Sequence, residues 1–202
     1  MFIFDKVYKK NRTSQSGNTN SFVKKALRYI KPDSRGLDLG CGQGQNIFYF
    51  ASKNFKMTAV DLSNIAVKQI KERISEQDSK NIEVIQADIS NYDIASNYYD
   101  FVVCLNVLQF LDKRNIIKLI NNVKNKIKKN GIIIISSFTN KDPSNKTKKR
   151  SIKYHFKQGE LANMFRDFEC LHYSEGIVVD KGHPGKEEKH IHGIVEIIAR
   201  KC

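Results

Sequence analysis

The sequence has 202 residues, of which 40% are hydrophobic and 28% are charged, and this composition is typical of a globular rather than a disordered chain. No apolar run approaches the roughly 18 residues that a membrane-spanning helix needs, so we expect no membrane association. The first residues, Met1 to Lys6, lack the basic and apolar regions of a signal peptide. We therefore expect a cytoplasmic protein of one domain.

The formal net charge is +14, which raises the question of nucleic-acid binding, because basic proteins attract phosphate backbones. Lysine, asparagine and isoleucine are abundant along the whole chain rather than in one patch. The densest basic cluster, at 146–150, has no aromatic residues between its charges, so it lacks the stacking groups of a single-strand binding groove. The charge leaves nucleic acid open as a partner but does not favour it.

The four cysteines are scattered, and no two of them form a Cys-x-x-Cys pair. This spacing argues against a zinc ribbon or a redox motif. Without an export signal, we expect all four to be reduced thiols.

Helical and strand patterns alternate along the chain, which predicts a parallel sheet with helices on its faces. In chain order we predict a helix over 20–30, strands over 36–39 and 56–60 with a helix over 46–52 between them, a helix over 63–77, strands over 82–86 and 100–105, a helix over 113–129, a strand over 132–137, a loop over 139–151, a helix over 158–165, and strands over 168–174 and 191–199. The connection 176–189 reads as a loop. Because a loop without a helix does not easily make a parallel crossover, we expect the last strand to be antiparallel.

The first predicted strand runs into the segment Asp38-Leu39-Gly40-Cys41-Gly42-Gln43-Gly44. Glycine lets backbone approach a ligand closely, and the following helix presents free N–H groups. The dinucleotide fingerprint would need a glycine where Gln45 stands. A carboxylate at Asp38 would also repel a pyrophosphate and suits a cationic cofactor. The segment therefore indicates a nucleoside cofactor other than a dinucleotide.

Two more carboxylates follow predicted strands. Asp61 ends the second strand, where it can accept hydrogen bonds from both ribose hydroxyls of an adenosine. Asp88 ends the third strand and is placed to reach the adenine edge. The alternative is structural: the glycines form an ordinary tight turn, and Asp61 and Asp88 cap helices.

Four segments in order resemble the motifs of the class I S-adenosylmethionine-dependent methyltransferases. They are Asp38-x-Gly40-x-Gly42-x-Gly44, Val60-Asp61-Leu62-Ser63, Ala87-Asp88-Ile89 and Tyr99-Asp100-Phe101-Val102-Val103. The resemblance implies an α/β fold with a Rossmann-like, seven-stranded, mostly parallel sheet, helices on both faces and the last strand antiparallel. It also implies bound S-adenosyl-L-methionine. One methyltransferase domain over 1–202 would then comprise an N-terminal lid and helix (1–34), a cofactor-binding core (35–137), and C-terminal strands with substrate-side loops (138–202).

The resemblance also implies roles for residues at the matching positions. They would contact the methionine part (Asp38, Leu105), the methionine and ribose together (Gly40, Cys41, Gly42), the ribose (Asp61) and the adenine (Leu62, Asp88, Ile89). Tyr8 and Phe22 are candidates for a lid, since an aromatic face attracts a sulfonium, although core packing explains Phe22 better.

Substrate class is indicated less directly. The segment Leu105-Asn106-Val107-Leu108 lacks the Asn/Asp-Pro-Pro-aromatic stretch of base-amine methyltransferases, and Cys104 lies inside an apolar strand. The segment 16–23 resembles the N-terminal segment of small-molecule methyltransferases. The segment 190–201 resembles the tail of the tellurite-resistance methyltransferases and their thiopurine-like relatives. We expect in-line methyl transfer to a small-molecule acceptor, a thiol or a chalcogen oxyanion. The alternatives are an RNA or other nucleic-acid methyltransferase, or a non-catalytic RNA-binding module.

His190 and His192 are the candidate catalytic residues. Period-two alternation puts both on one face of the last strand, where they could bind an anionic substrate or accept a proton. We predict no metal site, although a role as half-exposed strand-edge residues and a three-histidine metal site with His183 both stay open. The oligomeric state is not indicated by the sequence.

Overall fold

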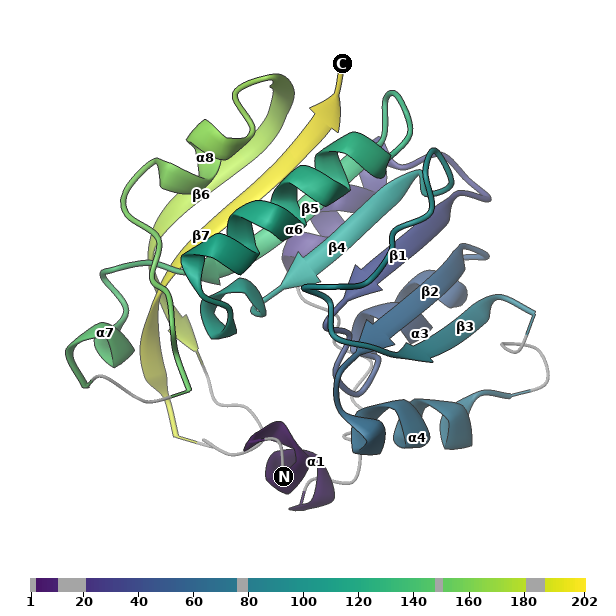
Figure 1. Ribbon diagram of the computed structural model, residues 1–202, viewed down its shortest axis with the longest axis horizontal. Coiled ribbons are helices and arrows are strands. Elements are labelled where there is room, and N and C mark those ends of the chain that lie inside the picture. Colours follow the sequence, from purple (N-terminus) through teal and green to yellow (C-terminus); the bar gives the residue numbers. More distant parts are fainter. Residues whose placement is uncertain (1–2, 11–20, 76–79, 148–150, 181–187) are drawn as a thin grey trace.

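A seven-stranded sheet with the order β3-β2-β1-β4-β5-β7-β6 forms the centre of the computed structural model, which describes residues 3–10, 21–75, 80–147, 151–180 and 188–202 (Figure 1). The strands are β1 (Arg35–Leu39), β2 (Lys56–Asp61), β3 (Ile82–Gln86), β4 (Phe101–Leu105), β5 (Ile132–Phe138), β6 (Phe168–Asp180) and β7 (His190–Lys201). Neighbours from β3 to β5 are parallel, whereas β7 is antiparallel to both β5 and β6. The predicted fold class is confirmed.

Helices cover both faces of the sheet because buried strand residues point alternately to opposite sides. In β4, Val102 and Cys104 pack in the cluster that contains α6 (Lys113–Lys126) and α8 (Glu160–Met164). Phe101 and Val103 pack in the opposite cluster with α2 (Ser21–Ala26) and α3 (Gln45–Ala51). The remaining helices are α1 (Ile3–Lys10), α4 (Asn64–Arg73), α7 (Pro143–Thr147) and the 3-10 turns η1 (Leu27–Tyr29) and η2 (Leu108–Phe110).

Two predicted helices end earlier than the sequence pattern indicates. The helix α6 ends at Lys126 because Ile127 takes an extended conformation, and its side chain is buried in the core. The helix α4 ends at Arg73, with extended Ile74 after it, and the predicted end at Gln77 lies outside the described residues. In both cases an apolar side chain that continues the helical period belongs to the next segment.

Two predicted loops are partly wrong. The segment 139–151 contains α7, where the side chain of Asp142 accepts a hydrogen bond from the Ser144 backbone N–H at 2.8 Å. The segment 176–189 is a strand over its first part, because Gly176–Asp180 pairs with His190–Ile194. Pairing with β7 therefore extends β6 beyond the predicted end at Ser174.

Within the described residues, no helix is both long and apolar enough to cross a membrane.

The close packing of β1 against its neighbours predicts that position 36 does not tolerate a side chain larger than that of Gly36. A Cβ atom there would lie 2.3 Å from Cζ of the fully buried Phe101 and 2.7 Å from Cε of Met57. We expect Gly36→Ala to lower the free energy of unfolding by about 1–3 kcal/mol through overpacking, measured by denaturant unfolding. Gly176→Ala is the matched control, because a Cβ at Gly176 would meet nothing within 4 Å. Equal stability of the two variants would contradict this prediction.

Candidate active site

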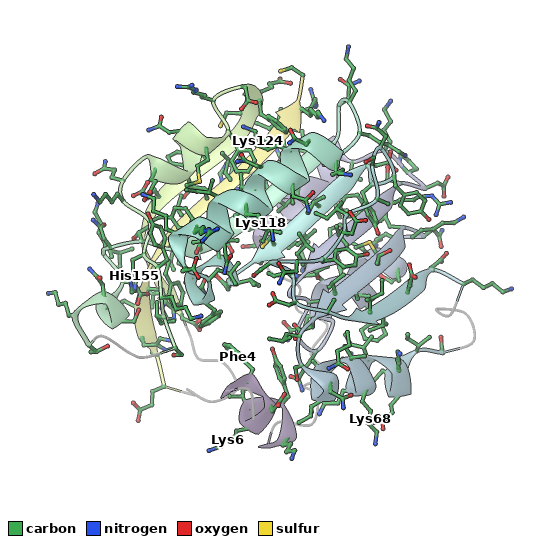
Figure 2. All side chains as sticks on the ribbon, in the orientation of Figure 1. Phe4, Lys6, Lys68, Lys118, Lys124 and His155 are labelled. Carbon is green, nitrogen blue, oxygen red and sulfur yellow. The ribbon has the colours of Figure 1, made fainter. Side chains whose placement is uncertain are left out.

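A cleft of about 670 Å³ opens at the carboxyl edge of β1, β2 and β4, with α1 as one wall. Figure 2 shows Phe4 on the side of α1 that faces the sheet, where its ring packs edge-on against Phe110 with 4.7 Å between centroids. The cleft brings together nine residues that the sequence assigns to the cofactor: Tyr8, Gly40, Cys41, Gly42, Asp61, Leu62, Asp88, Ile89 and Leu105. Asp38, the tenth, is buried and is not among the residues that line the cleft.

The glycine turn after β1 has backbone conformations that favour glycine. Gly40 and Gly42 have φ angles of +76° and +53°, in the left-handed region. A Cβ at Gly40 would lie 2.5 Å from Cγ2 of Val107, so no side chain fits there without displacing a wall of the cleft. The Gly40 and Cys41 backbone N–H groups both donate to the carbonyl of Val60, at 2.7 and 3.1 Å, which fixes the turn against β2.

Asp61 connects two strand ends through its carboxylate. Its Oδ2 accepts a hydrogen bond from the Gly42 N–H, and its Oδ1 accepts one from the Ser63 N–H, both at 2.8 Å. Burial raises the pKa of Asp61, and these two hydrogen bonds oppose that rise. An ionised carboxylate has about four lone-pair sites, so Asp61 can still accept two hydrogen bonds from a ligand.

Asp38 lies beneath the turn with 1% of its surface exposed. Its Oδ2 has no hydrogen-bond partner within the described part of the chain. Burial first, and then the charge of Asp61, raise the pKa of Asp38 to about 7, against an opposing hydrogen bond from Asn46. An unsatisfied buried carboxylate is costly unless a donor or cation meets it, so this oxygen is suited to a positively charged ligand group.

The third strand end contributes Asp88 and Ile89. Oδ1 of Asp88 accepts a hydrogen bond from the Ser90 N–H at 2.8 Å, and the Asp88 side chain is exposed toward the cleft. Cys41 also lines the cleft, but burial raises the pKa of its thiol well above the usual value. Because the thiolate is the reactive form, Cys41 is not suited to act as a nucleophile.

Comparison with known proteins agrees with this geometry. A profile of the family described as "Tellurite resistance protein TehB" matches residues 1–188. The chain belongs to the TehB family. This membership confirms the resemblance to class I methyltransferases.

Among TehB relatives, a Haemophilus influenzae protein named "Probable S-adenosyl-L-methionine-dependent methyltransferase TehB" is 30% identical over 176 residues, which cover 86% of this chain and 57% of the relative. The chain thus spans little more than half of that relative's length. The crystal structure of TehB from Haemophilus influenzae aligns with a TM-score of 0.79 and 26% identity, over 98% of this chain and 66% of that one. A Methanosarcina mazei structure titled as a SAM-dependent methyltransferase has a TM-score of 0.70 at 20% identity, over 88% of this chain and 96% of that one, and shows the shared fold.

In this TehB-family chain, two hydrogen bonds attach α1 to α4 and to Ser63, the N-cap residue of α4. The Ser63 hydroxyl donates to Asp5 at 2.6 Å, and the Gln69 side-chain amide donates to the Tyr8 carbonyl at 2.9 Å. Tyr8 lines the cleft, and burial followed by the charge of Asp61 raises the pKa of its hydroxyl. Phe22, the other lid candidate, is 2% exposed and packs in the core beneath α2, so a lid role for Phe22 is wrong.

The histidines His190 and His192 lie side by side at the start of β7 but are not among the residues that line the cleft within the described chain. The Phe138 ring stacks on His192 with 4.8 Å between centroids and 17° between planes. His183, the predicted third histidine, lies outside the described residues. The catalytic role of the pair stays a prediction.

Several residues of the cleft carry no motif signal in the sequence: Phe4, Val7, Phe110, Leu111, Asn115 and Lys153. Lys153 reaches the cleft because its backbone N–H donates to the Gln109 carbonyl at 2.8 Å, which brings a distant loop to the end of β4. That these six residues line the cleft is evident only from the three-dimensional structure.

The buried charge of Asp38 predicts a pH-dependent stability. Its folded-state pKa of about 7 lies above its ordinary value of 3.8, so the stability that Asp38 contributes is full only below about pH 3.8 and is lost as pH rises from there to about 7. Asp38→Asn stays neutral, so we expect its advantage over wild type in resistance to denaturant to be small near pH 4, to grow up to about pH 7 and to be constant at pH 8–9. The gain should approach a few kcal/mol, at about 1.4 kcal/mol per unit of pKa shift.

The control is Asp93→Asn, since the Asp93 side chain is exposed to solvent. We expect the stability difference between that variant and wild type to be constant across the same pH range. A pH-independent effect of Asp38→Asn would show that Asp38 does not carry the buried charge.

Proposed function

We propose that this chain is an S-adenosyl-L-methionine-dependent methyltransferase with a small-molecule acceptor, a thiol or a chalcogen oxyanion. The observation that carries the proposal is the unsatisfied, buried Oδ2 of Asp38 beneath a cleft lined by Gly40, Gly42 and Asp61. Membership of the TehB family and the name of the Haemophilus influenzae relative support it.

The residues of the cleft fit this cofactor chemically. The charge of Asp38 is complementary to the methionine ammonium, directly or through water. The remaining acceptor sites of Asp61 suit ribose hydroxyls, and Leu62, 43% exposed, offers an apolar surface to adenine. Because Gly40 and Gly42 present backbone instead of side chains, the ligand can lie close to the turn.

When bound, S-adenosylmethionine supplies a methyl group on a sulfonium, which an acceptor can take by in-line displacement. The contribution of the protein is then mainly to position the two molecules. The turn and the three carboxylates would hold the cofactor, while Tyr8 and Phe4 line the cleft from the side of α1. An aromatic face near a sulfonium also adds cation–π attraction.

The acceptor side of the cleft supports an anionic substrate. Asn106, Asn115 and Lys153 line it, and Lys153 supplies a positive charge. Both oxygens of Asp61 already accept backbone hydrogen bonds, so it is poorly placed to remove a proton from a substrate. A thiolate or an oxyanion needs no such base, whereas an amine or a hydroxyl acceptor does.

Calorimetry of S-adenosylmethionine and S-adenosylhomocysteine binding, with NAD as a control ligand, tests the cofactor. We expect saturable binding of the first two and none of NAD. Asp61→Ala should weaken binding by at least about 10–150-fold, since the loss of even one hydrogen bond to a charged group costs about 1.5–3 kcal/mol. Asp93→Ala, at an exposed site outside the cleft, should bind as wild type does. Folded wild-type protein that binds neither nucleoside would overturn the proposal.

Transfer of labelled methyl groups to small thiols, selenite, tellurite and RNA identifies the acceptor. With that acceptor, we expect the double substitution of His190 and His192 by alanine to lower kcat and leave cofactor affinity unchanged, because neither ring lines the cofactor cleft. The readouts are turnover and calorimetry on the same preparation. Wild-type turnover in the double variant would remove the pair from the active site, and transfer to RNA alone would replace the proposed acceptor class.

A further inference from the structure

Three potential metal ligands meet where β6 ends and β7 begins. Asp180 and His190 are directly opposite one another in the antiparallel register, and His192 lies two residues further along the same strand. Cross-strand partners and residues two apart share one face of a sheet. One ligand atom from each of the three side chains lies within 4.8 Å of the other two, and all three side chains are half-buried.

The surrounding hydrogen bonds determine which ring nitrogen of each histidine carries the proton. The Nδ1 of His190 lies 2.7 Å from the Glu188 carbonyl oxygen, which can only accept, so this Nδ1 carries a proton. The Nδ1 of His192 lies 2.8 Å from Oδ2 of Asp142, so it donates to that carboxylate in the same way. In the neutral rings both Nε2 atoms therefore present lone pairs.

These two Nε2 atoms face each other at 2.9 Å. Two lone pairs at that distance repel unless a positive charge lies between or beside them. A proton would join them as an imidazole–imidazolium pair, whereas a metal ion would bind both. In a tetrahedral zinc site with Zn–N bonds of about 2.0–2.1 Å, two ligand nitrogens lie about 3.4 Å apart, so a small opening of the pair suffices. The nearby Asp180 carboxylate favours the metal, because it supplies a third ligand.

His192 is held in a ligating orientation by its neighbours. Asp142 is 2% exposed, and it accepts hydrogen bonds from the Ser144 N–H, the Ser144 hydroxyl and the Gly193 N–H. Carboxylates that accept from the distal nitrogen of a ligating histidine are typical of zinc sites. The network continues from Ser144 to His155 beside α7 (Figure 2).

We propose that Asp180, His190 and His192 form a binding site for a divalent transition-metal ion such as Zn²⁺, with Asp142 as the positioning residue for His192. Two imidazoles and one carboxylate select zinc, cobalt or nickel over the oxygen-preferring Mg²⁺ and Ca²⁺. Three protein ligands leave one tetrahedral position for water or an exogenous anion. The site joins the ends of two strands, so metal binding should also stabilise the folded protein. The proposal stands independently of the proposed methyl transfer.

The test is calorimetry of Zn²⁺ and visible absorption of Co²⁺ on metal-stripped, full-length protein. Cys170 and Cys202 are exposed and can bind zinc themselves, so the titrations use a background with both changed to serine. We expect one ion per chain, a Co²⁺ spectrum typical of nitrogen and oxygen ligands, and a higher Tm with Zn²⁺ but not with Mg²⁺. His190→Ala, His192→Ala and Asp180→Asn should each remove saturable binding or weaken it at least tenfold.

Two further variants separate ligands from surroundings. His172→Ala changes another half-buried histidine on β6, away from the cluster, and should bind zinc as the background does. Asp142→Asn should weaken zinc binding by about 10–100-fold while leaving one ion per chain, as expected of a positioning residue. Circular dichroism confirms that each variant is folded. Absence of one-site zinc binding in the background protein, or binding that survives in both His190→Ala and His192→Ala, would overturn the proposal and leave the shared proton as the explanation of the pair.

Discussion

The carboxylate of Asp61 is the interaction on which the cleft depends. It accepts one hydrogen bond from the glycine turn after β1 and one from the start of α4 after β2, so two neighbouring strand ends are fixed to each other. Its negative charge also acts on its surroundings, since it contributes to the raised pKa values of Tyr8, Asp38 and Cys41. The same group therefore shapes the turn and sets the electrostatics of the cleft.

The cleft contrasts with the rest of the molecule in charge. The chain carries a formal net charge of +14, yet Asp61 and Asp88 line the cleft, and the buried Asp38 lies two residues before the glycine turn. A local acidic site on a basic protein selects against phosphate groups and in favour of a cationic, phosphate-free ligand. Lys153 lies among the lining residues as a positive charge, so the two parts of the cleft suit ligands of opposite charge.

The motifs predicted which residues meet at the strand ends of the cleft, because these residues are local in sequence. Each is in or next to a turn that directly follows a parallel strand, and the carboxyl ends of parallel strands meet at one edge. The wall formed by Phe4 and Val7 could not be predicted in the same way, since it depends on contacts between α1 and distant elements. Ile127 shows the same limit, because its helical spacing conceals that tertiary packing ends α6 before it.

For the histidine cluster, the register in which β6 pairs with β7 gives information that the alternation of residues along one strand does not. Alternation predicted that His190 and His192 share a face, and the structure confirms that they are adjacent. Asp180 was missed, since its position opposite His190 follows only when 176–180 is known to be a strand. Asp142 was missed because it comes from a short helix inside a segment that reads as a loop.

The position of β7 in the sheet has a consequence for biosynthesis. It follows every other strand in sequence, yet it lies between β5 and β6. While the ribosome is still making the preceding residues, one edge of β5 has no partner, and that strand contains four consecutive isoleucines, Ile132 to Ile135. An apolar, unpaired edge is a template for aggregation. The nascent chain thus passes through an interval in which this apolar edge is exposed, and the interval ends only when β7 inserts between β5 and β6.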